Sequence, residues 1–327
     1  MEYRTLGKTG WEISEVSFGT WALGGSWGRA VDEREALSAL SYAMERGVNF
    51  FDTADVYGDG RSEEFLGKAC GRRQDIIIAT KFCRAGDISD PLTYSYDQTK
   101  AYAVGSLKRL QRDRIDLYQI HCPPAWVIEQ GEVFQVLDRL KEEGLIRHYG
   151  VSVETVDEGL KAMTYPHVST LQVILNIFRQ KVVSELLPQA VSHKVGILAR
   201  VPLASGLLSG KFHAGDTFAA DDHRHFNRDG AAFNVGETFA GLPFAKGVEL
   251  VEKIRWIAQG RPNMAAAALR WILDQPGVSS VIPGFKNIRQ IDQNLSALDA
   301  ASFTDEELTE LRDFYRSSVA DHIRGAY

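Results

Sequence analysis

The sequence predicts an α/β fold, a closed (β/α)8 (TIM) barrel with an N-terminal β-hairpin and extra helices. Short apolar runs alternate with amphipathic segments of roughly 10–15 residues, which is the pattern of parallel strands joined by crossover helices. Eight such units fit within the 327 residues, and eight suit a closed barrel better than an open sheet. No linker-like stretch interrupts them, so we expect residues 1–327 to form a single domain.

The strands are expected where short apolar runs occur, and the helices where apolar residues recur with a helical period. The predicted strands are residues 16–19, 49–52, 76–81, 115–121, 148–152, 170–175, 196–201 and 280–282. The predicted helices are residues 32–46, 62–72, 96–110, 133–143, 156–162, 184–191, 244–258, 263–274 and 288–298, with one more after Thr304.

Two segments lie outside these units. Residues 3–14, YRTLGKTGWEIS, contain a Gly-Lys-Thr-Gly turn between alternating segments, which predicts a hairpin closing the bottom of the barrel. Residues 213–243 have no clean period and many Gly and Asp residues, as is typical of a long functional or disordered loop. We interpret His223 and His225 as side chains of this flexible, charged loop rather than as metal ligands, and expect no metal site.

Composition narrows the class of protein. The formal net charge is −6, which argues against nucleic-acid binding. No run approaches the roughly 20 apolar residues of a membrane helix. The cysteines Cys70, Cys83 and Cys122 lack CxxC spacing and are expected to be free thiols in a reducing compartment. We therefore expect a cytoplasmic protein without membrane partners, either monomeric or weakly homo-oligomeric.

Polar residues end three consecutive predicted strands. Asp52, Lys81 and His121 close the runs VNFFD, IIIATK and IDLYQIH, and Tyr57 follows Asp52 by five residues. Active sites of such barrels lie at this edge. A buried carboxylate needs a partner, and Lys81 can supply it.

The same arrangement suits reduction of a carbonyl. A cation beside a phenol lowers its pKa, which would make Tyr57 a general acid, while His121 could hydrogen-bond the same oxygen. Taken singly, Asp52 with Lys81 could be a structural ion pair and His121 a core histidine. The four residues together favour the catalytic interpretation.

Carbonyl reduction requires a hydride donor, usually a nicotinamide. Neither GxGxxG nor GxxxxGK[ST] occurs in the expected place. Two late stretches are candidates. ARVPLASGLLSGKF at 199–212 ends near Lys211, and VIPGFKNIRQIDQN at 281–294 places Lys286 and Arg289 at a helix start, where anions are favoured.

Several of these motifs together resemble the aldo-keto reductase superfamily along nearly the whole chain, with bacterial branches looking nearest. The matching stretches are GTWALGG (19–25), FFDTADVYG (50–58), ATKF (79–82), QIHCP (119–123), GVSVE (150–154), LQVILN (171–176), PLASGLLSGK (202–211) and IPGFKNIRQIDQN (282–294). The resemblance implies a (β/α)8 barrel, an NADPH/NADP+ cofactor and a catalytic tetrad of Asp52, Tyr57, Lys81 and His121.

The resemblance also implies a cofactor site and a substrate site. Ser152 and Gln172 would hold the carboxamide, the loop near Lys211 would strap the pyrophosphate, and Lys286 and Arg289 would lie near the 2′-phosphate. The implied cofactor-binding residues are Gly19, Thr20, Trp21, Asp52, Ser152, Gln172, Arg200, Pro202, Leu203, Ser205, Gly206, Leu207, Lys211, Gly284, Lys286, Arg289, Gln290 and Asn294. The substrate-binding residues are Trp21, Tyr57 and His121.

Two positions depart from the pattern. Val153 stands where the family usually has Asn, so the carboxamide would depend more on Gln172. Arg200 stands where many members have an aromatic residue. Its guanidinium could stack on the nicotinamide, and its charge would disfavour the oxidised cofactor.

The expected function is NADPH-dependent, reversible reduction of small-molecule aldehydes or ketones to alcohols. Two alternatives remain open: an NAD(P)-dependent sugar or alcohol dehydrogenase working in the oxidative direction, and a non-catalytic cofactor-binding sensing subunit, as in the potassium-channel β subunits of this superfamily. Substrate specificity is expected to come from residues 22–31, 84–95, 123–130 and 213–243 with the C-terminal tail.

Overall fold

The computed structural model describes residues 1–25 and 31–327, so part of the loop 22–31 lies outside the described residues. Its main feature is a sheet of eight parallel strands in the spatial order β10-β9-β8-β7-β6-β5-β4-β3. The strands are β3 (Phe18–Gly19), β4 (Phe50–Asp52), β5 (Ile77–Phe82), β6 (Ile115–His121), β7 (Ile146–Ser152), β8 (Val168–Ile174), β9 (Gly196–Arg200) and β10 (Val278–Val281). Each matches a predicted strand, with ends shifted by at most two residues.

The two edges of this sheet meet and close it into a barrel. Val16 and Gly19 form parallel bridges with Val281 and Gly284. The backbone N–H of Ser17 donates to the carbonyl of Val281 at 2.9 Å. The predicted (β/α)8 barrel is therefore confirmed.

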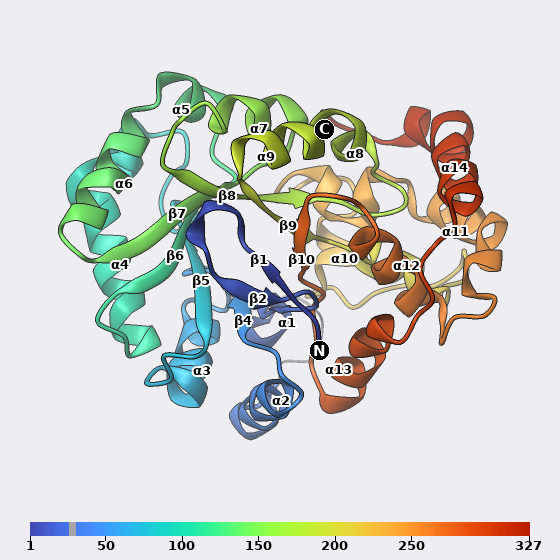
Figure 1. The fold of residues 1–327 in the computed structure, drawn as a ribbon, viewed down its shortest axis with the longest axis horizontal. Coiled ribbons are helices and arrows are strands. Elements are labelled where there is room, and N and C mark those ends of the chain that lie inside the picture. The colour runs from blue at the N-terminus through green and yellow to red at the C-terminus, as the bar shows by residue number, and fades with distance from the viewer. Residues whose placement is uncertain (26–30) are drawn as a thin grey trace.

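Helices surround the barrel in Figure 1. The α-helices are α1 (Trp21–Gly24), α2 (Glu33–Glu45), α3 (Arg61–Cys70), α4 (Tyr96–Leu110), α5 (Ala125–Gln130), α6 (Glu132–Glu142), α7 (Val156–Ala162), α8 (Lys181–Glu185), α9 (Leu187–His193), α10 (His223–Phe226), α11 (Phe244–Lys253), α12 (Met264–Leu273), α13 (Ile288–Leu295) and α14 (Asp305–Phe314). Short 3-10 turns are η1 (Gly7–Thr9), η2 (Pro91–Tyr94), η3 (Ala204–Ser209), η4 (Val235–Glu237), η5 (Phe239–Gly241), η6 (Arg255–Ala258), η7 (Ser296–Leu298) and η9 (Ala320–His322), and η8 (Tyr315–Val319) is a π-helical turn. None of the helices within the described ranges is long and apolar enough to cross a membrane.

Capping residues set several helix starts. The side chains of Asp32, Ser95, Thr155, Asn287 and Thr304 accept a hydrogen bond from a backbone N–H of the first helical turn, which satisfies a donor that has no partner inside the helix. The expected helix 184–191 is wrong, because the structure has two helices there, α8 and α9. Pro188 lies in the first turn of α9, where its missing N–H costs nothing, whereas it would break a continuous helix.

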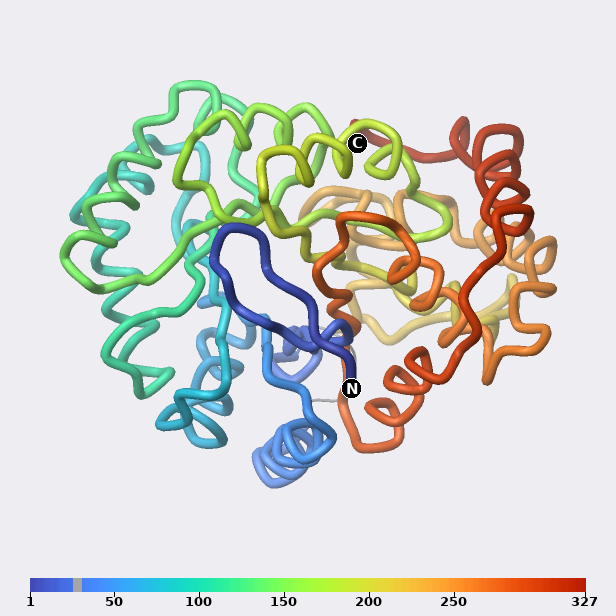
Figure 2. Tube along the Cα trace, viewed as in Figure 1, coloured from blue at the N-terminus to red at the C-terminus, as the bar shows by residue number. Residues whose placement is uncertain are grey.

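The N-terminal hairpin plugs one end of the barrel. Strands β1 (Tyr3–Thr5) and β2 (Glu12–Ser14) pair antiparallel, and the hairpin crosses the barrel in Figure 2, in dark blue. Its Leu6 and Ile13 are fully buried in an apolar cluster with interior side chains such as Phe50 and Leu117. The predicted hairpin is thus confirmed, and its apolar residues form the floor of the barrel.

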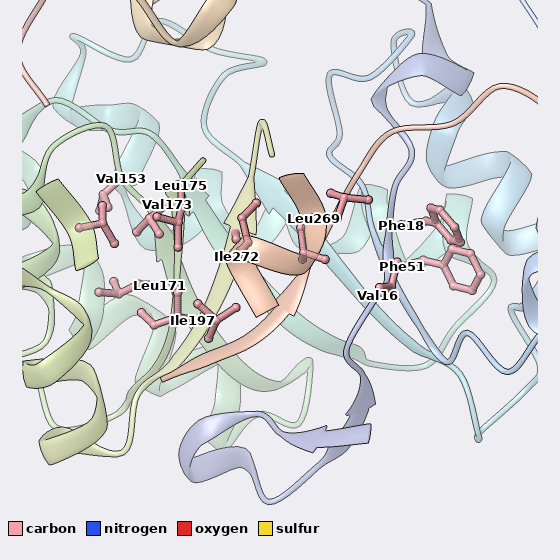
Figure 3. Packing of buried hydrophobic residues seen from close by; sticks show 14 of the residues in the cluster. Val16, Phe18, Phe51, Val153, Leu171, Val173, Leu175, Ile197, Leu269 and Ile272 are labelled. Carbon is pink, nitrogen blue, oxygen red and sulfur yellow. The ribbon is translucent and has the colours of Figure 1, made fainter. Parts of the chain in front are cut away.

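A larger apolar cluster lies between the barrel and its helices. Figure 3 shows part of it, including Leu171 of β8, Ile197 of β9, and Leu269 and Ile272 of α12. These side chains are fully buried. The cluster holds the helices against the strands and so fixes the loops that follow each strand.

Residues 213–243 form a packed segment rather than a flexible loop. They contain α10, η4 and η5, and bury Asn227 and Phe239. The Asn227 side chain accepts hydrogen bonds from the backbone N–H groups of Ala232 and Phe233. His225 is exposed as predicted, but the interpretation of His223 as a flexible surface residue is wrong, since its side chain is fully buried.

Candidate active site

Alternate residues of each strand point into the barrel, and near the carboxyl ends of the strands these inward residues are polar. The inward residues nearest the hairpin are apolar and belong to one cluster. Polar residues follow at spacings of two. Along each strand, the inward-pointing residues are Phe50 and then Asp52 in β4, Ala79 and then Lys81 in β5, and Leu117, Gln119 and then His121 in β6.

Asp52 and Lys81 form a buried ion pair among these polar residues. The Nζ of Lys81 donates to Asp52 Oδ2 at 2.5 Å and to the carbonyl of Thr53 at 2.8 Å. Asp52 Oδ1 accepts hydrogen bonds from Gln172 Nε2 at 2.7 Å and Gln119 Nε2 at 3.1 Å. Both carboxylate oxygens are therefore satisfied, which is what a buried charge requires.

Tyr57 lies beside this pair. Its hydroxyl is 3.4 Å from Lys81 Nζ, and its ring packs edge-on against His121 with centroids 5.7 Å apart. Lys81 lowers the pKa of Tyr57 as predicted, but the expected net fall of that pKa below its usual value is wrong for this structure. Burial raises that pKa more than the Lys81 charge lowers it, and Asp52 adds to the rise. The phenol thus keeps its proton at neutral pH.

His121 is neutral at the same pH. Burial, together with the positive charges of Arg84, Lys81 and Arg200, holds the pKa of His121 well below its usual range. A neutral imidazole carries one N–H donor and one acceptor nitrogen. The four predicted tetrad residues therefore meet at the strand ends, with the phenol protonated and the imidazole uncharged.

A cavity of about 420 Å³ opens from these residues toward α13. That volume falls in the usual range for small-molecule sites. The predicted residues that line it are Gly19, Trp21, Asp52, Tyr57, His121, Ser152, Gln172, Arg200, Pro202, Leu203, Ser205, Gly206, Lys211, Gly284, Lys286, Gln290 and Asn294.

Four predicted residues lie outside the cavity lining. Lys81 is buried behind Asp52 and Tyr57. Thr20 is also buried, and its hydroxyl donates to the carbonyl of Asp52 at 2.9 Å. Leu207 is buried in the apolar core, and Arg289 is exposed on the first turn of α13.

Several other residues that line the cavity are not identified by the sequence alone. They include Phe212, Arg224, Glu237, Phe285 and Gln293. Arg224 and Glu237 come from the irregular segment 213–243, where no periodic pattern indicates which side chains point inward. Gln119, which supports Asp52, could have been found from its spacing of two residues before His121.

The backbone around the cavity fits an extended phosphate-bearing ligand. In η3, Ala204, Ser205 and Gly206 have φ values of 47°, 56° and 98°, a left-handed conformation that costs free energy at non-glycine residues and is typical of functional sites. Gly284 has open space where a side chain would begin, so the chain can approach a ligand closely there. Lys211 and Lys286 bring positive charge to this end of the cavity, which is also lined by Arg224, whose guanidinium pairs with Asp222. These observations fit NADP+ or NADPH.

Arg200 is held by groups other than an aromatic ring. Its guanidinium donates to the carbonyl of Val153 at 3.3 Å and to Cys122 Sγ at 3.4 Å, and Nη1 lies 3.5 Å from Glu237 Oε1. The Glu237 carboxylate thus compensates the positive charge of Arg200, which on its own would disfavour binding of the oxidised cofactor.

Comparisons with known proteins agree with this site. The model of the Aldo/keto reductase family matches residues 15–316. The chain is 31% identical to aldo-keto reductase YhdN of Bacillus subtilis, over 99% of this chain and 96% of that one. It is 31% identical to a probable voltage-gated potassium channel subunit beta of Arabidopsis thaliana, over 91% and 92% of the two chains.

A solved structure shows the same fold. An aldo/keto reductase from Klebsiella pneumoniae in complex with NADP and acetate superposes with a TM-score of 0.70, at 25% identity and 96% coverage of both chains. Since the family model spans most of the sequence and the barrel is complete at the tetrad, the chain belongs to the Aldo/keto reductase family.

Proposed function

We propose that this protein reduces aldehyde or ketone substrates to alcohols with NADPH, reversibly. The observation that carries the proposal is the chain of contacts from Asp52 through Lys81 to Tyr57, which ends at a cavity of about 420 Å³ that extends to Lys286, Gln290 and Asn294. The Klebsiella relative's complex with NADP supports the choice of cofactor.

Each residue of the site has a separate role in the proposed reaction. NADPH, when bound, supplies the hydride that reaches the carbonyl carbon. Tyr57 delivers its proton to the carbonyl oxygen, and the Lys81 ammonium stabilises the phenolate left behind. His121, being neutral, can donate a hydrogen bond to the same oxygen and orient it. Ser152 and Gln172 lie where they could position the nicotinamide carboxamide.

Two other functions remain candidates, each with its own support. The similarity to a potassium channel subunit beta favours a cofactor-binding sensing subunit. The reversibility of the same chemistry allows an NAD(P)-dependent sugar or alcohol dehydrogenase. The complete tetrad favours the reductase. As expected from composition, we propose a single-domain cytoplasmic protein, monomeric or weakly self-associating.

The test compares the wild type with Tyr57→Phe. NADPH absorbance would be followed with a reactive aromatic aldehyde, and NADPH binding would be measured separately by fluorescence. Removal of the hydroxyl should reduce kcat by about 100-fold or more while NADPH binding persists. Tyr118→Phe is a matched control, since the buried Tyr118 hydroxyl has no hydrogen-bond partner among the described residues.

Normal turnover by Tyr57→Phe would exclude Tyr57 as the proton donor. A wild type that binds NADPH tightly yet reduces neither aldehydes, ketones nor sugars would favour the sensing subunit.

A further inference from the structure

We propose that Glu237 is a specificity-determining residue that binds a hydroxyl group next to the substrate carbonyl, so that the preferred substrates are uncharged hydroxy-aldehydes or hydroxy-ketones. This inference rests on the proposed reductase function. It concerns a residue of the irregular segment 213–243 that lines the same cavity as Asp52, Tyr57 and His121.

Glu237 is positioned by the packing of its segment. It ends η4, where its N–H donates to the carbonyl of Asn234 at 3.1 Å. Its own carbonyl accepts a hydrogen bond from Ser205 Oγ at 3.2 Å. The side chain lines the same cavity as Tyr57 and His121, close enough that its charge raises the pKa of Tyr57.

The carboxylate of Glu237 accepts no hydrogen bond from the residues that the structure describes. Its side chain is only 10% exposed, and no group in the described parts of the chain donates a hydrogen bond to Oε1. Arg200 and Arg84 approach this oxygen at 3.5 and 3.7 Å, distances of ion pairing rather than of good hydrogen bonds. Oε1 is closed off from solvent and is stabilised by these two positive charges. A ligand hydroxyl in the cavity would therefore donate to the other carboxylate oxygen, Oε2.

The surrounding charges disfavour an anionic substrate. Arg84 also pairs with Glu154 at 3.2 Å, so two guanidinium groups face two carboxylates. Burial raises the pKa of Glu237, but the positive charges of Arg200 and Arg84 lower it by more. The pKa of Glu237 therefore lies below its usual value, and the side chain stays ionised. One atom each of Cys122, Glu154 and Glu237 lies within 4.8 Å of the others, but the arginines already neutralise this group. The cluster therefore offers hydrogen bonds without net charge.

Trp21 and Tyr57 contribute aromatic rings to the same cavity. The Trp21 ring lies 6.0 Å from Tyr57, 4.8 Å from the buried His223 and 5.9 Å from Phe233, centroid to centroid. Such rings suit the C–H faces of a small hydroxylated carbon chain. Aromatic rings and a carboxylate in one cavity are an environment that distinguishes a hydroxy-aldehyde from a plain aldehyde.

The test uses three two-carbon substrates that differ at one position: acetaldehyde, glycolaldehyde and glyoxylate, which carry a methyl, a hydroxymethyl and a carboxylate group beside the aldehyde. The kcat/KM of each would be measured for the wild type, Glu237→Gln and Glu154→Gln. Comparing variants on the same substrate cancels differences in aldehyde hydration. Glu154→Gln is the matched control, because it removes the same charge from the same cluster without lining the cavity.

The wild type should prefer glycolaldehyde over both other substrates. Glu237→Gln should lower the glycolaldehyde-to-acetaldehyde ratio by about 10- to 100-fold, the effect of losing a hydrogen bond to a charged acceptor. Its ratio for glyoxylate over acetaldehyde should rise, because Arg84 and Arg200 lose a counter-charge. Glu154→Gln should leave the glycolaldehyde-to-acetaldehyde ratio within about twofold of the wild type.

Three results would overturn the inference: an unchanged ratio in Glu237→Gln, an equal fall in Glu154→Gln, or a wild type that prefers glyoxylate. In each of these, Tyr57-dependent reduction of acetaldehyde would still uphold the proposed function. If neither these aldehydes nor a wider panel of aldehydes, ketones and sugars is reduced, the proposed function fails and the inference with it. Should Glu237→Gln not fold, Glu237→Asp, which withdraws the carboxylate by one methylene, should show the same loss of preference.

Discussion

At the scale of single residues, the site depends on charges that are buried and fully partnered. Lys81 is completely buried and Asp52 nearly so, and each would be costly alone. Asp52 has three donors within hydrogen-bond distance. The carboxylate therefore holds Lys81 beside the Tyr57 hydroxyl, and in the proposed reaction Asp52 acts as a positioning residue.

Asp52→Asn should consequently destabilise the whole fold. Removing one partner of a buried ion pair leaves the Lys81 charge uncompensated, at a cost of about 3–5 kcal/mol. Urea unfolding at neutral pH would measure it. The exposed pair of Glu33 and Lys68 offers a control, since Glu33→Gln should change the free energy of unfolding by less than about 1 kcal/mol. Equal effects of the two variants would contradict the buried-charge argument.

A second buried carboxylate behaves differently. The carboxyl oxygens of Asp55 have no hydrogen-bond partner of good geometry among the described residues. Burial, with a contribution from Glu63, raises the pKa of Asp55 to about 7, against the smaller opposing effects of Arg109 and the Val56 N–H. Because the unfolded value is about 3.9, the folded state holds this proton more tightly. The stability linked to Asp55 is thus full below about pH 4 and is lost as the pH rises toward 7.

Asp55→Asn should remove this dependence on pH. At pH 8 the variant should be more stable than the wild type by up to about 4 kcal/mol, and the two should converge near pH 4. Urea unfolding across pH 4–8 would show it. The control is Asp59→Asn, an exposed aspartate of the same loop with a left-handed backbone that asparagine tolerates. A wild-type profile that does not fall between pH 4 and 7 relative to Asp55→Asn would refute the assignment.

At the scale of elements, the hairpin is fixed to the barrel by close backbone contact. Gly7 has φ 50°, and a Cβ added there would lie 2.2 Å from the backbone nitrogen of Gly196. The N–H of Lys8 donates to the carbonyl of Lys194 at 2.7 Å. This contact places Leu6 inside the barrel.

Gly7→Ala should therefore be much more destabilising than Gly10→Ala. Both glycines are left-handed, with φ 50° and 71°, but a Cβ at Gly10 meets nothing within 4 Å. Each change costs about 1–2 kcal/mol for its backbone conformation, and Gly7→Ala should cost roughly 1–3 kcal/mol more from overpacking. Thermal and urea denaturation would give the difference. Similar values for both variants would mean that the hairpin can move away from β9 freely.

At the scale of the whole molecule, the sequence predicts well those features that depend on the regular alternation of strands and helices. Asp52 and His121 end predicted strands, so their place at the barrel edge and their proximity follow from the fold. Lys81 fits the same pattern one residue before its strand ends. The pKa of Tyr57 did not follow, because it depends on the balance between burial and the Lys81 charge, which only the packed structure sets.

Glu237 and Arg224 show the other limit of prediction. They reach the cavity from a segment without hydrophobic period, whose course is set by tertiary hydrogen bonds such as those of Asn227 and Ser205. Pro188 indicates from the sequence that a single helix cannot continue there, as the separate helices α8 and α9 show. No comparable local signal marks the inward side chains of residues 213–243.

Because the cavity joins strand ends to α13 and η3, a bound cofactor should stabilise the whole molecule. At about 100 times its Kd, NADPH should add roughly 2.7 kcal/mol to the free energy of unfolding. Lys286 lines the cavity, whereas Arg289 is exposed and does not. If the 2′-phosphate binds at this end, Lys286→Ala should shrink the rise in Tm produced by NADPH more than that produced by NADH, and Arg289→Ala should do so less. Thermal denaturation at matched NADPH and NADH concentrations would measure all four shifts. Equal losses with the two cofactors would remove Lys286 from the 2′-phosphate site, and a larger loss in Arg289→Ala would show that the exposed guanidinium folds back over the bound phosphate.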